Sequence, residues 1–286
     1  MRDFFFHAPN DVKGVLSLLD EHGEDARVMA GGTAMMLKMK QSLLDANHVV
    51  SLQNVQGLNY VNRENGSLRI GALTKHRDVE TSSEVKKSNP LLADVFSRIA
   101  TILIRNVATV GGGLAHSAPA QDPQPTLLAL GASVKVASTS EEREIPLSEF
   151  LLDYYETALQ PGEVITELVV PDPPKGSEGV YIKYLPRTAD DYPTVGVVAI
   201  GLVVDGICQD VRLGLGAVAA TAIRATTVED FLKGKEVSAQ NVRQAAEAVA
   251  EIVDPLTDPR GSADYKRDMA VVFARRALEQ ALGVTQ

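Results

Sequence analysis

The chain has 286 residues, 45% of them hydrophobic and 23% charged, and its formal net charge is −9 at pH 7. This length and balance are typical of a soluble globular protein with two or three compact units. The acidic charge and the scattered Lys and Arg residues argue against a nucleic-acid-binding surface. No apolar run approaches the roughly 20 residues of a membrane helix, and Pro9 precedes any signal-peptide core, so we expect a cytoplasmic protein.

Cysteine and histidine usage limits the chemistry of this chain. The single cysteine, Cys208, excludes an intramolecular disulfide and an iron–sulfur cluster or zinc site ligated by cysteines of this chain alone. The five histidines are far apart in the sequence, and none has the HxxxH or HExxH spacing of two ligands on one helical face, so we expect no metal site. No GxSxG elbow occurs and no acid–base constellation stands out, so we assign no catalytic side chain.

Residues 1–56 are predicted to form a small β-turn-α-β unit. Asn10 or Asp11 can cap a helix with apolar positions at helical spacing, and Gly23 ends it. A short strand at 27–29 then leads directly into the glycine turn "AGGT". A helical stretch, "AMMLKMKQSLL", and a second strand, "HVVSLQNV", complete the unit.

Residues 57–174 are predicted to form a second unit with strands and helices. "LNYVNRENGSLRIGALT" predicts a hairpin that turns at Asn65-Gly66. Two helices broken around Asn89-Pro90 follow, then a bare loop, "ATVGGGLAHSAPAQD". A helix at 124–130 and the strand "ASVKVAS" come next, and "PDPPKG" marks the boundary of the unit.

Residues 175–286 are predicted to form a C-terminal domain. "VYIKYLPR", "TVGVVAIGLVVDG" and "DVRLGLGAVAA" have the composition of strands. "SAQNVRQAAEAVAEIV" and "SADYKRDMAVVFARRALEQAL" place apolar residues at helical spacing, which favours two packed helices.

Two glycine turns, "MAGGT" at 29–33 and "TVGGG" at 109–113, suggest a ligand site. Each could offer unobstructed backbone N–H groups to an anion, and together they could clamp a diphosphate from two sides. Asp122 could accept hydrogen bonds from ribose hydroxyls, or it could simply cap the following helix. The glycines could equally serve tight turns that need positive φ. Neither turn is GxGxxG, so a Rossmann nicotinamide site is disfavoured.

Three segments carry a resemblance to a known family. "AGGTAMMLKMK", "IRNVATVGGGLAHSAPAQD" and "DPRGSADYKRDMAVVFARRAL" resemble the FAD-binding medium subunit of the molybdenum hydroxylases, the carbon monoxide dehydrogenase and xanthine dehydrogenase group. The resemblance covers essentially the whole chain. It implies an α+β protein with a two-part FAD-binding domain, a small β-α-β unit plus an antiparallel sheet with helices. A C-terminal α+β domain with a small sheet and a helix bundle would follow.

The resemblance also implies which residues hold FAD. Lys183 would stabilise negative charge on the reduced ring, and Tyr192, in "ADDY", would lie near the isoalloxazine. The family usually has Asn or Ser where this chain has Gly113, so that contact would be missing or would come from His116 or Ser117. Ala34 stands where a polar residue is common, which removes another possible contact. The implied FAD-binding residues are Ala30, Gly31, Gly32, Thr33, Ala34, Thr109, Val110, Gly111, Gly112, Gly113, Asp122, Ile165, Lys183 and Tyr192.

The function implied by the resemblance is electron transfer within a multi-subunit molybdenum-containing hydroxylase. FAD would pass electrons from the [2Fe–2S] clusters of a small partner subunit to an external acceptor, while a large subunit holds the molybdopterin cofactor. The family implies a dimer of such three-subunit units. Two alternatives stay open: a self-sufficient FAD oxidoreductase, and a non-catalytic nucleotide-binding assembly subunit.

Overall fold

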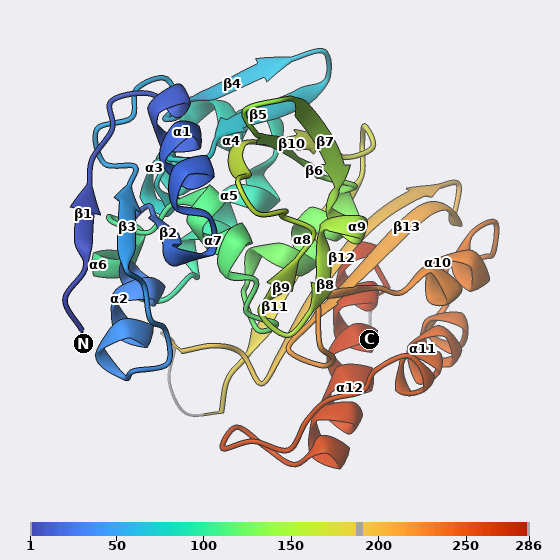
Figure 1. The fold of residues 1–286 in the computed structure, drawn as a ribbon. Coiled ribbons are helices and arrows are strands. Elements are labelled where there is room, and N and C mark those ends of the chain that lie inside the picture. Colours follow the sequence, from blue (N-terminus) through green and yellow to red (C-terminus); the bar gives the residue numbers. More distant parts are fainter. Residues whose placement is uncertain (1, 187–190, 285–286) are drawn as a thin grey trace.

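The protein is an α+β structure, as predicted from the resemblance (Figure 1). A computed structural model describes residues 2–186 and 191–284. The N-terminal elements and the C-terminal helices lie at opposite ends of the molecule, with the central sheet and its helices between them (Figure 1). Within these described residues no helix combines the length and the apolar character needed to cross a membrane.

The N-terminal part is a three-stranded parallel sheet in the order β1-β3-β2. The first helix, α1, begins and ends where the sequence predicts, because Asp11 accepts a hydrogen bond from the Gly14 amide and Gly23 (φ +51°) closes its C-terminus. Its buried side chains pack against Val50 of the central strand. The elements are β1 (Phe5–His7), α1 (Val12–His22), the 3-10 turn η1 (Gly23–Asp25), β2 (Ala26–Met29), α2 (Thr33–Lys40) and β3 (His48–Ser51).

The central part is a five-stranded antiparallel sheet in the order β4-β5-β10-β6-β7. The predicted hairpin turns at Asn65 (φ +50°) and Gly66 (φ +76°), the two positive φ values of a type I′ turn. The strands of this sheet are β4 (Val61–Glu64), β5 (Ser67–Gly71), β6 (Ser133–Ala137), β7 (Glu142–Pro146) and β10 (Val164–Pro171). A separate two-stranded sheet consists of β8 (Leu151–Asp153) and β9 (Glu156–Thr157). The helices are α3 (His76–Thr81), α4 (Ser83–Ser88), α5 (Pro90–Ser97), α6 (Ile102–Arg105), α7 (Val110–His116), α8 (Pro123–Leu130) and α9 (Leu147–Phe150).

The glycine-rich segment is not the open loop that its composition predicts. Gly111, Gly112 and Gly113 lie in α7, and none of them has a positive φ. The helix forms because it packs closely on the end of β5: a Cβ at Gly111 would lie 2.7 Å from the Cβ of Ala72. In the first turn, by contrast, Gly32 does have a positive φ, +71°.

The C-terminal part is a four-stranded antiparallel sheet, β11-β12-β13-β14, with three helices. The long strand β12 reads as an unbroken apolar run because α12 packs against it on one side and α8 also contacts it. The elements are β11 (Glu178–Tyr184), β12 (Val195–Val204), β13 (Ile207–Gly216), β14 (Ile223–Arg224), α10 (Thr226–Leu232), α11 (Ala239–Glu247), the 3-10 turn η2 (Ala248–Glu251) and α12 (Ala263–Ala281). The division of the chain at 56/57 and 174/175 stays a prediction.

The fold also brings together histidines that are far apart in the sequence. The parallel pairing of β1 with β3 sets Phe5 opposite His48, so His7, two residues further on, points to the same face as His48. The last residue of α1, His22, stacks on the His48 ring, with centroids 3.7 Å apart. These histidines are therefore neighbours in the fold, although they are far apart in the sequence.

Candidate cofactor-binding site

A cavity of about 480 Å³ lies where the two glycine turns meet. This volume is within the range of about 300–1,000 Å³ typical of ligand sites. The cavity is lined by the end of β2 and the start of α2, by the segment from β5 to α3, by α6 and α7, by residues before α8, and by the start of β10. Segments almost 80 positions apart in the chain thus form one site.

Most of the residues expected from the resemblance line this cavity. The two exceptions are Val110, which is 2% exposed and packs into the central core, and Lys183, which lies behind Asp122. The residues that do line it are Ala30, Gly31, Gly32, Thr33, Ala34, Thr109, Gly111, Gly112, Gly113, Asp122, Ile165 and Tyr192.

The first turn presents free backbone donors to the cavity. Gly32 is the N-cap of α2, and the first amide of the helix with a backbone acceptor is that of Met36, which donates to the Gly32 carbonyl at 2.9 Å. Within the described residues the amides from Gly32 to Ala34 have no protein acceptor. Such free N–H groups at the start of a helix favour an anion.

The second turn differs, because its amides already have protein acceptors. The expected two-sided clamp of free N–H groups is therefore wrong on this side, and the turn instead presents glycine backbone without side chains. The amide donors are Val110 to the Thr74 carbonyl (2.9 Å), Gly111 to the Ala72 carbonyl (2.8 Å), Gly112 to Thr109 Oγ1 (3.1 Å) and Gly113 to the Thr109 carbonyl (2.9 Å).

The space beside Gly113 is bordered by Gln121 and His76. A Cβ at Gly113 would lie 3.5 Å from His76 Cε1 and 3.6 Å from Gln121 Oε1, and the Gln121 amide donates to the Gly113 carbonyl at 3.0 Å. Of the two residues expected to compensate for Gly113, His116 lines the cavity, whereas Ser117 is buried at the C-cap of α7.

His76 is a cavity residue that sequence analysis missed. Its side chain is almost fully buried, and Nδ1 has no hydrogen-bond partner within the described residues. Burial, and secondarily the charge of Arg105, lowers the pKa of His76 to about 4, so the ring is neutral at pH 7. The ring atoms that face the space beside Gly113 are Cε1 and Nε2, so Nε2 is the nitrogen that a ligand there could reach. Nothing in the sequence connects His76 to the glycine turns, because the contact is tertiary.

Asp122 lies at the cavity, held by two side chains from β11. The Tyr181 hydroxyl donates to Oδ1 at 2.7 Å, and the Lys183 ammonium donates to Oδ2 at 3.0 Å and to the Arg98 carbonyl at 2.8 Å. Burial raises the pKa of Asp122, against the opposing effects of Lys183 and Tyr181. Burial and the nearby carboxylate raise the pKa of Tyr181, which keeps it a donor. Each carboxylate oxygen retains a lone pair for a ligand hydroxyl.

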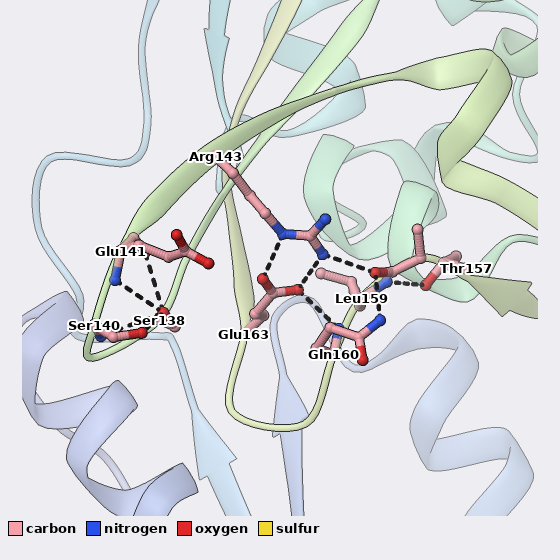
Figure 2. Close-up of polar contacts among 9 residues, drawn as sticks. Ser138, Ser140, Glu141, Arg143, Thr157, Leu159, Gln160 and Glu163 are labelled. Carbon is pink, nitrogen blue, oxygen red and sulfur yellow. Dashed lines mark hydrogen bonds and ion pairs between the residues drawn. The ribbon is translucent and has the colours of Figure 1, made fainter.

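An ion pair fixes the segment that leads to Ile165. Arg143 donates from two guanidinium nitrogens to both carboxylate oxygens of Glu163, at 2.7 and 2.8 Å (Figure 2). Glu163 also lines the cavity. The same guanidinium donates to the Ala158 carbonyl at 2.9 Å, and the Gln160 amide donates to Glu163 at 2.7 Å. The Arg143 guanidinium, with its hydrogen bonds, lowers the pKa of Glu163 despite partial burial. The loop before β10 is therefore closed by charged hydrogen bonds on the rim of the cavity.

Tyr192 lies at the opening of the cavity and is 36% exposed. The guanidinium of Arg260 lies 5.7 Å from the centre of the Tyr192 ring. The backbone amide of Tyr192 donates to the Asp191 carboxylate at 2.7 Å. The first two residues of the "ADDY" motif, Ala189 and Asp190, lie outside the described residues.

Comparisons with known proteins agree with this geometry. Residues 2–173 match the family of the FAD binding domain in molybdopterin dehydrogenase, and residues 180–281 match the carbon monoxide dehydrogenase flavoprotein C-terminal domain. The carbon monoxide dehydrogenase medium chain of Hydrogenophaga pseudoflava is 33% identical over 97% of this chain and 96% of its own. Subunit alpha of the 6-hydroxypseudooxynicotine dehydrogenase complex of Paenarthrobacter nicotinovorans is 32% identical over 98% of this chain and 94% of its own.

A solved structure gives the same result. A chain of Hydrogenophaga pseudoflava carbon monoxide dehydrogenase, in a form that lacks the Mo-pyranopterin moiety, superposes with a TM-score of 0.95 at 33% identity, over 99% of this chain and 98% of that one. The chain therefore belongs to the FAD-binding flavoprotein subunits of molybdenum-dependent oxidoreductases, the family that includes the carbon monoxide dehydrogenase medium chains.

Proposed function

We propose that this chain is an electron-transfer subunit that binds FAD in the cavity between its two glycine turns. Electrons would arrive from the [2Fe–2S] clusters of a small partner subunit, after substrate oxidation at the molybdenum cofactor of a large subunit, and leave to an external acceptor. The observation that carries the proposal is the pairing of free amides on the first turn with a bare, closely packed second turn across one cavity.

The residues present fit the diphosphate and ribose of FAD. The free amides from Gly32 to Ala34 would donate to the diphosphate, and the Lys38 ammonium, on the same helix and lining the same cavity, adds positive charge. The bare backbone of Gly112 and Gly113 would let the cofactor approach the main chain. Asp122 would accept a hydrogen bond from a ribose hydroxyl.

The rest of the cavity fits the flavin ring. When bound, FAD supplies a group that accepts and releases electrons one or two at a time. Ile165 provides an apolar wall, and the half-exposed Tyr192 lies where the ring would meet solvent. His76 would offer Nε2, the ring nitrogen on the side of Gly113, as a neutral hydrogen-bonding group. Lys183 would act through Asp122, because the ammonium lies behind that carboxylate.

The proposed electron route requires partner subunits that hold the iron–sulfur clusters. Its one cysteine, Cys208, is buried in β13, so iron–sulfur clusters must be held by another chain. Exposed apolar side chains beside the cavity support a partner there: Leu103 is 74% exposed, and Ile104 both lines the cavity and reaches the surface. The cytoplasmic location and the dimer of three-subunit units expected from the resemblance belong to the same proposal.

The first experiment is the absorption spectrum of the purified chain, with the released chromophore identified by mass. We expect one FAD per chain. In the variant Gly113→Leu the larger side chain must enter the cavity or displace His76 and Gln121, so we expect most of the flavin to be lost with the fold retained. Ala239→Leu, on the exposed face of α11 in the C-terminal part, is the matched control and should keep its flavin.

The outcomes separate the three candidate functions. A colourless chain that takes up no added FAD would overturn the flavoprotein proposal and leave an assembly subunit. A yellow chain whose flavin is reduced by a small substrate without any partner would favour the self-sufficient oxidoreductase. Reduction that occurs only in the complex with the iron–sulfur and molybdenum subunits would support electron transfer.

A further inference from the structure

Three histidines gather outside the FAD cavity, on the α1 side of the N-terminal sheet. His7 ends β1, His48 begins β3 and His22 ends α1, so each comes from a different element. His7 Nε2 and His48 Nδ1 lie 3.0 Å apart, and one ring nitrogen from each of the three histidines lies within 4.8 Å of the other two. All three side chains are only half-buried, so an ion can reach them from solvent.

The surroundings of the three rings favour a cation. His22 is the last residue of an 11-residue helix, whose C-terminus carries partial negative charge. The Glu21 carboxylate lies 3.9 Å from His22 Nε2, and Asp25 adds negative charge near His48.

We propose that His7, His22 and His48 bind one divalent transition-metal ion such as Zn²⁺, each through one ring nitrogen. Imidazole is a preferred ligand of zinc, copper, nickel and cobalt in their divalent states, and three histidines leave a fourth position for water or for Glu21. The site is independent of the FAD cavity, and it would tie β1, α1 and β3 together.

The geometry is close to that of a bound site. Zinc–nitrogen bonds of about 2.0–2.1 Å in a tetrahedron put ligand nitrogens about 3.3 Å apart. The nitrogens of His7 and His48 are already at 3.0 Å, so an ion would replace their hydrogen bond. His22 now stacks on His48 face to face, and its ring must turn about the Cβ–Cγ bond to direct a nitrogen to the ion. Its partial exposure leaves room for that rotation.

The ion would stabilise β1, which has few other contacts. β1 has three residues and pairs only with β3 within the described residues, so its contacts to the rest of the unit are few. A ligand that binds only the folded form stabilises it in proportion to the logarithm of its concentration over the dissociation constant. At a hundredfold excess over that constant we expect the melting temperature of the whole chain to rise by about 5 °C.

The test uses the full chain, stripped with a chelator and dialysed, and titrated with Co²⁺ and Zn²⁺ alone. We expect one Zn²⁺ per chain by calorimetry, intense ligand-field absorption of tetrahedral Co²⁺, and displacement of Co²⁺ by Zn²⁺. Each of His7→Gln, His22→Gln and His48→Gln should weaken binding at least tenfold, as loss of one of three ligands requires. His116→Gln, a histidine outside the cluster, should bind as the unchanged chain does.

Two results would overturn the proposal: no binding of either ion at about 100 μM, a concentration well above that of a useful site, or binding that survives all three substitutions. His22→Gln decides the case if the two strand variants fail to fold, because the His22 side chain is partly exposed and lies at a helix end instead of in the sheet. Hydrogen exchange of the β1 amides gives a second readout, since protection of that strand should increase with the ion only where all three histidines are present.

Discussion

Two glycines of α7, two positions apart, should respond in opposite ways to the same added methyl group. A Cβ at Gly111 would lie 2.7 Å from the Ala72 Cβ and 2.9 Å from the Ala72 carbonyl oxygen, which are closer than real contacts allow. A Cβ at Gly113 would have no neighbour nearer than 3.5 Å. We therefore expect Gly111→Ala to destabilise the protein and Gly113→Ala to leave it unchanged or slightly more stable.

The difference in the free energy of unfolding between the two variants follows from packing and helix propensity. Gly111→Ala forces α7 away from Ala72 and lengthens the hydrogen bond from the Gly111 amide to the Ala72 carbonyl, now 2.8 Å. Overpacking of this kind costs about 1–3 kcal/mol of the free energy of unfolding. Gly113→Ala gains up to about 1 kcal/mol from helix propensity. The difference of about 1–4 kcal/mol corresponds to melting temperatures separated by roughly 2–15 °C for a unit of this size.

Thermal unfolding of the flavin-free variants, followed by circular dichroism, measures this difference. FAD content is the second readout: Gly111→Ala should lose flavin because α7 moves, whereas Gly113→Ala should retain it because a single methyl group fits. Equal melting temperatures for the two variants would refute the reasoning, as would a Gly113→Ala protein less stable than Gly111→Ala.

Three further predictions concern buried titratable side chains. Asp122→Asn leaves the Lys183 ammonium, 5% exposed, without its counter-charge, so we expect a loss of about 3–5 kcal/mol in urea unfolding; a loss below about 1 kcal/mol would contradict the buried ion pair. Glu163→Gln should lower the free energy of unfolding by about 1 kcal/mol, because the paired hydrogen bonds from the partly exposed Arg143 to the carboxylate are lost. It should also weaken FAD binding, measured by fluorescence titration. Unchanged stability and affinity would show that this ion pair does not support the site. The pKa of His76, about 4 when folded and 6.5 when unfolded, means that the unfolded chain binds more protons below pH 6.5. Stability should thus fall by about 2 kcal/mol between pH 7 and pH 5, and His76→Gln should flatten that slope in denaturant titrations at each pH.

Local chemistry in the sequence predicted many element boundaries. Asp11 and Gly23 delimit α1, and Asn65-Gly66 turns the hairpin, because each signal depends only on neighbouring backbone groups. Pro90 starts α5 for the same reason, since a missing amide proton costs nothing in the first helical turn. The resemblance to the medium-subunit family added the overall fold and the cofactor, both of which the family matches show.

Features that depend on tertiary contacts could not be predicted from the sequence. The run of glycines at 111–113 favours a loop by composition, yet it is helical because β5 packs against it. Lys183 turns to Asp122 instead of the cavity, because the buried carboxylate needs a counter-charge. His7, His22 and His48 have no ligand-like spacing, because three different elements carry them.

The glycines of the two turns are needed for close packing within the protein as well as for binding a ligand. A Cβ at Gly31 would lie 2.2 Å from the Val107 carbonyl oxygen, just as a Cβ at Gly111 would collide with Ala72. These two glycines let the first turn, the second turn and β5 come into backbone contact, and the cavity exists because they do. The free amides beginning at Gly32 and the open surface at Gly113 are what this close packing leaves for the cofactor. Substitutions at Gly31 and Gly111 should therefore change folding first, whereas a large side chain at Gly113, such as that of Gly113→Leu, should chiefly reduce flavin binding.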